Sequence, residues 1–290
     1  MVVVFAFYFI YTQLLHNTKL NWVNFWILIQ TKATFGTVFF ILTLSFCNRF
    51  LEILKWQNLV SVIKPVSIFE STKQVLASLT VGIFTPNGIG EYAGKALFYP
   101  KTETKKIIFL NLICNGIQMI ITIFFGTLGL FILGFYKSGL FITLFLLSCT
   151  ILLFTSKKIK IKGYSIQKLM FHINKIPKKI HQKNIFYGLL RYLIFTHQFY
   201  FIFIFFGVNL PYLSMMASKS CIYFLSSSLP SFQFLDFAVK GGVAVYYLGL
   251  LGVNEWIVII VTTLMWFLNV VVPIAIGSFF VLGYKPNTLN

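Results

Sequence analysis

The stretch Thr85-Pro86-Asn87-Gly88-Ile89-Gly90-Glu91 interrupts an otherwise apolar segment, 66–100, and it decides how the chain folds. Proline removes a backbone N–H donor and blocks the continuation of a helix, and two glycines within three positions weaken helical structure further. The stretch is therefore predicted to separate two short helices, one over Ile68–Phe84 and one that starts at Glu91. Neither helix is long enough to cross a membrane alone.

A second segment, 211–254, has the same layout. A predicted helix over Met215–Ser228 leads into the break Leu229-Pro230-Ser231-Phe232, and a second helix resumes with Asp236 and Lys240. In both segments an acid follows the proline by five or six residues, and a lysine follows the acid by four. That spacing places acid and lysine on one face of a helix.

The composition excludes an ordinary soluble domain. Of 290 residues, 58% are hydrophobic and only 10% are charged, whereas about a quarter are charged in soluble proteins. The 24 basic residues outnumber the 6 acids, and they lie between apolar stretches. This distribution is typical of a membrane protein and does not indicate a nucleic-acid partner. The four cysteines have no CxxC spacing, so we expect no metal site and no cofactor.

Crossing about 30 Å of hydrocarbon requires roughly 20 apolar helical residues. Five stretches meet or approach this length, namely Thr34–Leu54, Ile107–Tyr136, Leu140–Thr155, Ile185–Val208 and Trp256–Gly283. The run Val2–Leu15 lacks the basic start and cleavage site of a signal peptide and is predicted to be a further spanning helix. The predicted fold is an all-α integral membrane protein with about six spanning helices and two broken re-entrant helical segments.

The lysines predict the orientation of these helices. The loop 156–184 contains nine lysines and no acid, which indicates the cytoplasmic side. Six spans then place both termini in the cytoplasm. Segment 66–100 enters the membrane from inside and segment 211–254 enters it from outside.

The chain is therefore expected to form a single membrane domain, 1–290, whose halves 1–155 and 185–290 are related as an inverted repeat. The basic cytoplasmic loop 156–184 joins the halves. Inverted repeats are common in transporters, where the substrate site lies between the repeats near the middle of the membrane.

Non-helical backbone is tolerated at membrane depth where it lines a cavity or is packed inside protein. If it lines a cavity, the backbone near Gly88 and Gly90 can approach a ligand, and the N–H groups of the following half-helix attract an anion. Lys95 then adds a charge that Glu91 positions. If it is packed, the prolines are simple kinks and the acid–lysine pairs contribute about a few tenths of a kcal/mol. The candidate residues are Pro86, Asn87, Gly88, Gly90, Glu91, Lys95, Pro230, Asp236 and Lys240.

Arg49 and Glu52 form a further candidate pair in the first of the five long apolar stretches. Their spacing places them on one helix face. Charged residues inside a membrane are costly and usually functional. Near the end of a span, however, they can also act as anchors that extend to the interface. The sequence leaves both interpretations open.

The Gly88-Ile89-Gly90-Glu91-Tyr92-Ala93 run matches the glycine pattern of dinucleotide-binding proteins. That pattern requires a preceding strand and an acid about 20 residues later. Neither is present in the sequence, so no nucleotide cofactor is expected.

The motif Pro86-Asn87-Gly88-Ile89-Gly90-Glu91 resembles the P-G-x-x-G-E motif of the transmembrane region of the lysylphosphatidylglycerol synthetase family, with Asn87 in place of the first glycine. The region around Asn48-Arg49-Phe50-Leu51-Glu52 is similar to the second span of that family. The family's second motif, P-x-P-G-G-x-G-x-x-E, is matched only at Pro230 and Asp236. The resemblance extends over essentially the whole chain.

The resemblance implies an inverted-repeat bundle that moves a lipid, often with a modified or sugar-bearing head group, between leaflets. Aminoacyl transfer in the family belongs to a separate soluble domain, and this sequence ends at Asn290, so no enzymatic activity is expected.

The expected function is that of a lipid flippase-like transporter in a bacterial-type cytoplasmic membrane, acting on a modified or anionic lipid with a phosphate-bearing head group. A separately encoded lipid-modifying enzyme is a candidate partner. The alternative is a membrane protein that binds lipid or regulates a lipid- or glycan-modifying enzyme without transport. A membrane glycosyltransferase with Glu52, Glu91 or Asp236 as base is a third option, disfavoured because only six acids are present.

Overall fold

The computed structural model of the chain describes residue 30 and residues 34–155, 160–161 and 164–283. The predicted helix Val2–Leu15 lies outside these residues. Within them the fold is helical, apart from one antiparallel pair of two-residue strands.

The longer helices are α3 (Phe35–Val60), α4 (Ile68–Gly82), α5 (Gly90–Ala96), α6 (Thr104–Ile132), α7 (Tyr136–Thr155), α8 (Ile166–Asn174), α9 (Lys178–Phe205), α10 (Tyr212–Ser228), α11 (Asp236–Gly249), α12 (Glu255–Trp266) and α13 (Val272–Leu282). The short elements are η1 (Lys101–Glu103), β1 (Lys160–Ile161), β2 (Tyr164–Ser165), η2 (Gln233–Leu235) and the π-helical turn η3 (Phe267–Val271).

Five helical stretches are long and apolar enough to cross a membrane, as the sequence predicts. They are α3, α6, α7, α9 and the continuous stretch α12–η3–α13. Two of them extend further than their apolar residues indicate, because α3 continues to Val60 and α9 begins at Lys178. Helical hydrogen bonding does not stop where hydrophobic side chains stop. The predicted loop 156–184 therefore includes the first turns of α9, as well as α8.

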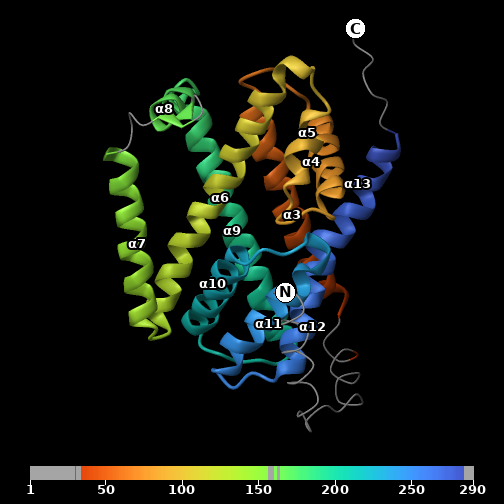
Figure 1. The fold of residues 1–290 in the computed structure, drawn as a ribbon. Coiled ribbons are helices and arrows are strands. Elements are labelled where there is room, and N and C mark those ends of the chain that lie inside the picture. Colours follow the sequence, from red (N-terminus) through yellow and green to blue (C-terminus); the bar gives the residue numbers. More distant parts are fainter. Residues whose placement is uncertain (1–29, 31–33, 156–159, 162–163, 284–290) are drawn as a thin grey trace.

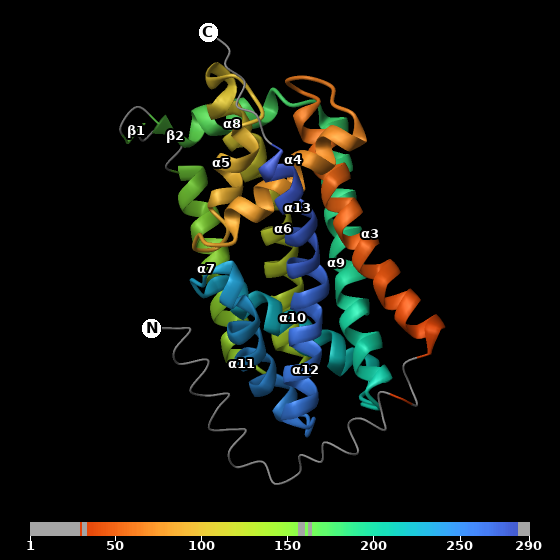
Figure 2. The same ribbon diagram turned by 90° about the vertical axis from the view of Figure 1, so that its right-hand side faces the viewer.

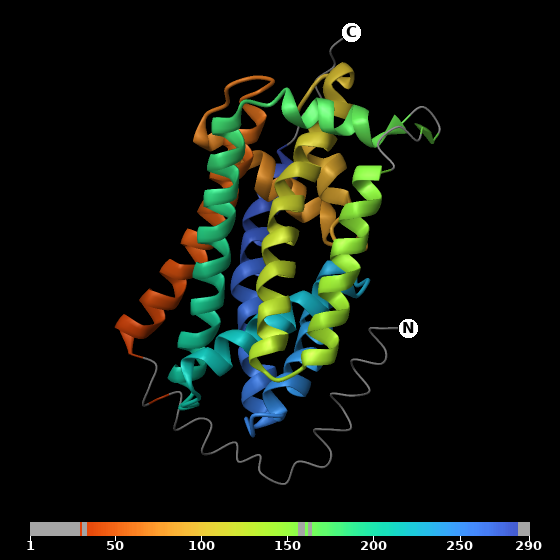
Figure 3. The ribbon, with the colours of Figure 1, turned by 90° about the vertical axis from the view of Figure 1, so that its left-hand side faces the viewer.

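The two broken segments lie at opposite ends of an elongated bundle (Figures 1 and 2). Helices α4 and α5 occupy the end at which α3 finishes and α6 begins. Helices α10 and α11 occupy the end at which α9 finishes and α12 begins. Helix α8 lies across the same end as α4 and α5 (Figure 3).

The long helices pack in a definite order. Helix α3 runs along α9, α6 packs against α10, and α13 packs against α4. Buried side chains form two apolar clusters. One surrounds Phe199, Phe203 and Leu248 of α9 and α11, and the other surrounds Trp56 and Ile107 of α3 and α6.

Glycines bring two of these helix pairs into close contact. A Cβ at Gly126 of α6 would lie 2.3 Å from the Cβ of Phe224 on α10. A Cβ at Gly277 of α13 would lie 2.3 Å from the carbonyl oxygen of Leu76 on α4. Small residues at such contacts allow membrane helices to approach closely, which favours van der Waals packing.

We therefore expect Gly126→Val to destabilise the protein by about 1–3 kcal/mol, the usual cost of overpacking. Gly116→Val is the matched control, because Gly116 lies on the same helix with nothing within 4 Å of its Cβ position. Thermal unfolding in detergent compares the two variants. Equal unfolding temperatures for both would contradict the assignment of a close α6–α10 contact.

Candidate functional site

The two breaks meet at the centre of the structure. Pro86 and Phe232 form an isolated antiparallel bridge. Next to it, the Asn87 backbone N–H donates to the Ser231 carbonyl oxygen at 2.8 Å, and the Ser231 N–H donates to Asn87 Oδ1 at 3.1 Å. Segments that are 144 residues apart in sequence thus satisfy each other's backbone groups. This contact explains how non-helical backbone is accommodated between the helices.

Asn87 suits this contact in two ways. Its backbone φ is 50° and that of Gly88 is 68°, both in the left-handed region. Glycine enters that region freely, and asparagine does so more readily than most residues. Asparagine also supplies the side-chain oxygen that Ser231 requires, which a glycine at the same position does not.

The start of α5 does not offer the unpaired amides on which the predicted anion site depends. The Gly90 N–H donates to Thr85 Oγ1 at 2.8 Å, and the Glu91 N–H donates to the Gly88 carbonyl oxygen at 2.9 Å. These amides are therefore occupied by the chain itself. A Cβ at Gly90 would lie 2.9 Å from the Val81 carbonyl oxygen, so this glycine serves close packing and not the approach of a ligand.

Lys95 also differs from the prediction. It is 1% exposed, and its Nζ donates to Asn111 Oδ1 at 2.7 Å and lies 4.6 Å from the Trp56 ring centroid. Lys95 and Glu91 share α5, yet they form no ion pair. Helical spacing sets only the face, and the long lysine side chain follows its partners on α6 and α3.

The second break matches the prediction more closely. Asp236 and Lys240 form an ion pair on α11, one helical turn apart. Ser231 Oγ donates to Asp236 Oδ1 at 3.2 Å, which joins this pair to the break. Pro230 is placed at the break itself, after the last residue of α10.

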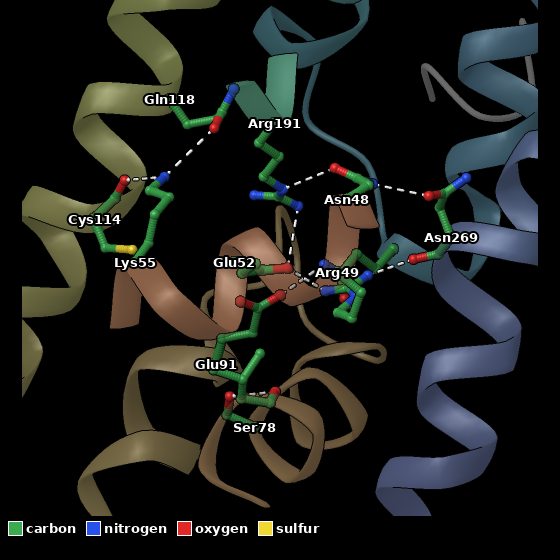
Figure 4. A network of polar contacts seen from close by, with 12 residues as sticks. Asn48, Arg49, Glu52, Lys55, Ser78, Glu91, Cys114, Gln118, Arg191 and Asn269 are labelled. Atoms are coloured by element: carbon green, nitrogen blue, oxygen red, sulfur yellow. Dashed lines mark hydrogen bonds and ion pairs between the residues drawn. The ribbon is translucent and has the colours of Figure 1, made fainter. Parts of the chain in front are cut away.

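Arg49 and Glu52 belong to a buried network (Figure 4). Glu52 is 7% exposed and forms an ion pair with Arg49 on its own helix. It forms a second ion pair with Arg191 on α9, in which Arg191 Nη2 lies 3.1 Å from Glu52 Oε2. The side chains are therefore held by protein partners, and the interpretation as interfacial anchors does not fit. Both arginines of the chain contact this one carboxylate.

The network continues to the last spanning stretch. Arg49 Nη2 donates to the Asn269 carbonyl oxygen, and Asn48 Nδ2 donates to Asn269 Oδ1 at 2.8 Å. In a regular helix that carbonyl would accept from residue 273, but Pro273 has no N–H. The helix widens into the π-helical turn η3 at this point. Pro273 therefore leaves a carbonyl free for the guanidinium of Arg49.

A cavity of about 250 Å³ lies beside this network, between the two broken segments and the long helices. Its polar lining consists of Asn48, Arg49, Glu52, Glu91, Gln118, Arg191, Tyr192, Thr196, Lys219, Tyr223, Gln233, Asp236, Lys240, Thr262 and Asn269. Its apolar lining consists of Leu79, Phe195, Phe199, Ile222, Met265, Trp266 and Val270.

Some of the predicted site residues line the cavity and others do not. It is lined by Arg49, Glu52, Glu91, Asp236 and Lys240, which the structure brings together from α3, α5 and α11. It is not lined by the residues of the breaks and their neighbour, namely Pro86, Asn87, Gly88, Gly90, Lys95 and Pro230. Five of the six charged candidates therefore line the cavity, whereas the proline and glycine residues of the breaks do not.

Lys219 of α10 is a cavity residue that the sequence prediction did not include. It is 4% exposed, and its Nζ lies 4.6, 4.1 and 4.2 Å from the ring centroids of Phe195, Phe199 and Tyr223. Aromatic faces stabilise a cation at such distances. Among the described residues, no carboxylate lies within ion-pair distance of this ammonium, and no acceptor forms a hydrogen bond with it.

Two other site residues had visible signals in the sequence. Arg191 is one of only two arginines and interrupts an apolar span. Asn269 precedes Pro273 by four residues, which is the spacing that frees a helix carbonyl. Gln233 had no such signal, because its role depends on the contact between the breaks.

Among the described residues, no three His, Cys, Asp or Glu side chains gather in a manner suited to a metal ion. Comparison of the chain with protein-family models, with curated proteins and with solved structures finds no match in any of the three. The site must therefore be interpreted from its own geometry.

Proposed function

We propose that the protein is a flippase-like transporter that moves an anionic lipid between the leaflets of a bacterial-type cytoplasmic membrane. The observation that carries this proposal is the charged cavity between the two broken segments of a helical membrane bundle. A cavity with buried ionisable groups inside a membrane protein usually marks the path of a polar substrate.

The charges of the cavity favour an anionic head group. Four cations line it, Arg49, Arg191, Lys219 and Lys240, against the three carboxylates of Glu52, Glu91 and Asp236. Lys240 and Asp236 neutralise each other in an ion pair, whereas the single negative charge of Glu52 neutralises only one of its two arginines. A phosphate group complements the remaining positive charge through charge-assisted hydrogen bonds.

The packing order supports the interpretation as an inverted repeat. If α3, α4, α5 and α6 correspond to α9, α10, α11 and α12–α13, then the contact of α6 with α10 has its counterpart in the contact of α13 with α4. Both contacts are made by glycines. The related helices α3 and α9 pack on each other. Such an arrangement allows a site to open to one side of the membrane and then to the other.

The resemblance to the transmembrane region of the lysylphosphatidylglycerol synthetase family agrees with this function. We propose that the chain is a member of that family. The lysine-rich segment 156–184 favours an orientation with α8 and the α4–α5 end on the cytoplasmic side. In this orientation segment 66–100 enters from the cytoplasm and segment 211–254 from outside, with both termini in the cytoplasm.

Reconstitution tests the proposal. Proteoliposomes carry a trace of acyl-NBD-phosphatidylglycerol or acyl-NBD-phosphatidylcholine, and dithionite quenches only the label in the outer leaflet. We expect the protein to move the phosphatidylglycerol analogue faster than protein-free liposomes do. Equal rates with and without protein for the anionic lipid would contradict the proposal.

Lys219→Met is expected to reduce this translocation about ten- to a hundredfold. Methionine fills the aromatic cage but has no charge, and a hydrogen bond to a charged group contributes about 1.5–3 kcal/mol. Lys64→Met is the matched control, because Lys64 is exposed outside the cavity. If the rate of Lys219→Met equals that of the control, Lys219 does not contact the head group.

The second candidate is a membrane protein that binds lipid, or regulates a lipid- or glycan-modifying enzyme, without transport. The observation in its favour is the direct backbone contact between the breaks at Asn87 and Ser231, which also suits a static, packed core. Lipid binding without translocation, together with co-purification of such an enzyme, would support it.

A further inference from the structure

Glu91 is a buried carboxyl without a cation at ion-pair distance. It is 8% exposed and lines the cavity. The other acids of the cavity, Glu52 and Asp236, each form at least one ion pair, whereas Glu91 forms none among the described residues. Burying an unpaired carboxylate is costly, so a carboxyl in this setting is stabilised when it takes up a proton.

The surroundings of Glu91 contain few other charges. Those within electrostatic reach are Lys95 on its own helix and Glu52 and Arg49 on α3. The ammonium of Lys95 is bonded to Asn111, and Arg49 is bonded to Glu52 and Asn269.

The helices packed against α5, namely α4 and α6, add few charged or titratable groups near Glu91. Glu91 lies against Gly82, at the end of α4. Glu70 and Lys73 are in the first two turns of α4, and Lys105 and Lys106 are in the first turn of α6. Cys114, further along α6, accepts from Lys55 through its backbone carbonyl.

Within the part of the chain that the structure describes, the Glu91 side chain forms one hydrogen bond, and this bond crosses between the two broken segments. Gln233 Nε2, in the second segment, donates to Glu91 Oε1 at 2.8 Å, while Gln233 Oε1 is buried and has no hydrogen-bond partner among the residues that the structure covers. An amide can serve either protonation state of a carboxyl, since it donates to a carboxylate and, turned over, accepts from a protonated acid. Gain or loss of a proton at Glu91 therefore alters a contact at the junction of the breaks.

We propose that Glu91 is the proton-binding site of a lipid–proton symporter, in which the anionic head group and one proton occupy the cavity together. This inference rests on the proposed function. A carboxylate at Glu91 repels an anionic head group, and protonation removes the repulsion. By linkage, each ligand then strengthens the binding of the other.

The charges balance in this scheme. A lipid with one negative charge and one proton cross together with no net charge. The proton is taken from water on the side where the lipid enters and is released to water on the other side, as the lipid leaves. Because the movement is electroneutral, the pH difference alone sets the final distribution of the lipid. One pH unit corresponds to about a tenfold ratio between leaflets.

The first experiment imposes a pH difference of about one unit on proteoliposomes that contain acyl-NBD-phosphatidylglycerol. Wild-type protein is expected to enrich the lipid about tenfold in the leaflet facing the more alkaline side. Glu91→Gln, which mimics the protonated acid, is expected to move the lipid without this enrichment. Glu103→Gln is the control, because Glu103 pairs with exposed Lys106 and neither residue lines the cavity, and it should behave as the wild type.

Translocation by the wild type without any enrichment would overturn the symport mechanism while leaving the proposed function intact. Enrichment by Glu91→Gln equal to that of the wild type would exclude Glu91 as the site. Absence of translocation by the wild type would refute the proposed function and, with it, symport.

A second measurement tests proton binding without transport. Infrared spectra of the protein in nanodiscs report the C=O band of protonated carboxyls. A titrating band is expected that Glu91→Gln removes and that persists to higher pH with phosphatidylglycerol than with phosphatidylcholine. If Glu91→Gln leaves every such band unchanged, Glu91 is not a proton site. If the band titrates identically in the two lipids, proton and anion are not coupled.

Discussion

Glu52→Gln is expected to destabilise the protein by about 3–5 kcal/mol, the usual cost of removing one partner from a buried ion pair. Glu52 stands between Arg49 and Arg191, so its loss leaves two guanidinium groups facing each other without a counter-charge. Glutamine keeps the shape of the side chain, and therefore the effect reports the charge. The measurement is the unfolding temperature of the purified protein in detergent.

Glu103→Gln is the matched control for this variant, because Glu103 also pairs with a cation three residues away. Its partner Lys106 has a side chain that is 67% exposed, and exposed pairs contribute about 0–1 kcal/mol. Unfolding temperatures that fall equally in the two variants would contradict the account of Glu52 as the centre of a buried network.

The double variant Glu52→Gln, Arg191→Gln sharpens the test. Removing one positive charge together with the carboxylate leaves Arg49 without a repelling neighbour, so we expect part of the lost stability to return. Residues in one ionic network are coupled, and their effects do not add. A double variant that loses the sum of the two single losses would indicate that the charges act independently.

The membrane-spanning helices follow from the sequence because a single property, apolar length, decides them. The five described spans match the stretches predicted from that property. Several of their ends do not match, since helix termini depend on local partners. Asn58 of α3, for example, donates to the Ile180 carbonyl oxygen of α9 at 2.8 Å, a contact beyond both predicted spans.

The site was predictable only in part. The breaks were located by Pro86 and Pro230, and the acids that line the cavity, Glu52, Glu91 and Asp236, were all candidates. The direction of Lys95 was not predictable, because its partner Asn111 comes from another helix. The mutual contact of the breaks likewise depends on tertiary packing and leaves no local trace in the sequence.

A disulfide across the two breaks is expected to stop lipid translocation. Pro86 and Phe232 are bridge partners in an antiparallel arrangement, where opposite Cα atoms lie about 4.5–5.5 Å apart. A disulfide requires about 4.4–6.8 Å, so Pro86→Cys with Phe232→Cys should form one. If transport requires the breaks to separate, the bond holds the cavity in one state and should lower the rate at least about tenfold.

The cross-linking experiment needs a background without native cysteines, and two single-cysteine variants as controls. All four native cysteines, Cys47, Cys114, Cys149 and Cys221, are free, so they are first replaced by alanine. The two single-cysteine variants then report any effect of the substitutions or of the oxidant alone. They are expected to translocate lipid equally under oxidising and reducing conditions.

In the proposed mechanism an anionic lipid crosses the membrane through the cavity between the two breaks. This mechanism is tested most directly by the initial rate of acyl-NBD-phosphatidylglycerol translocation by the Pro86→Cys, Phe232→Cys protein, measured in the same proteoliposomes before and after reduction. We expect the oxidised protein to be inactive and reduction to restore transport. A fully cross-linked protein that moves the lipid as fast as the reduced protein would contradict it.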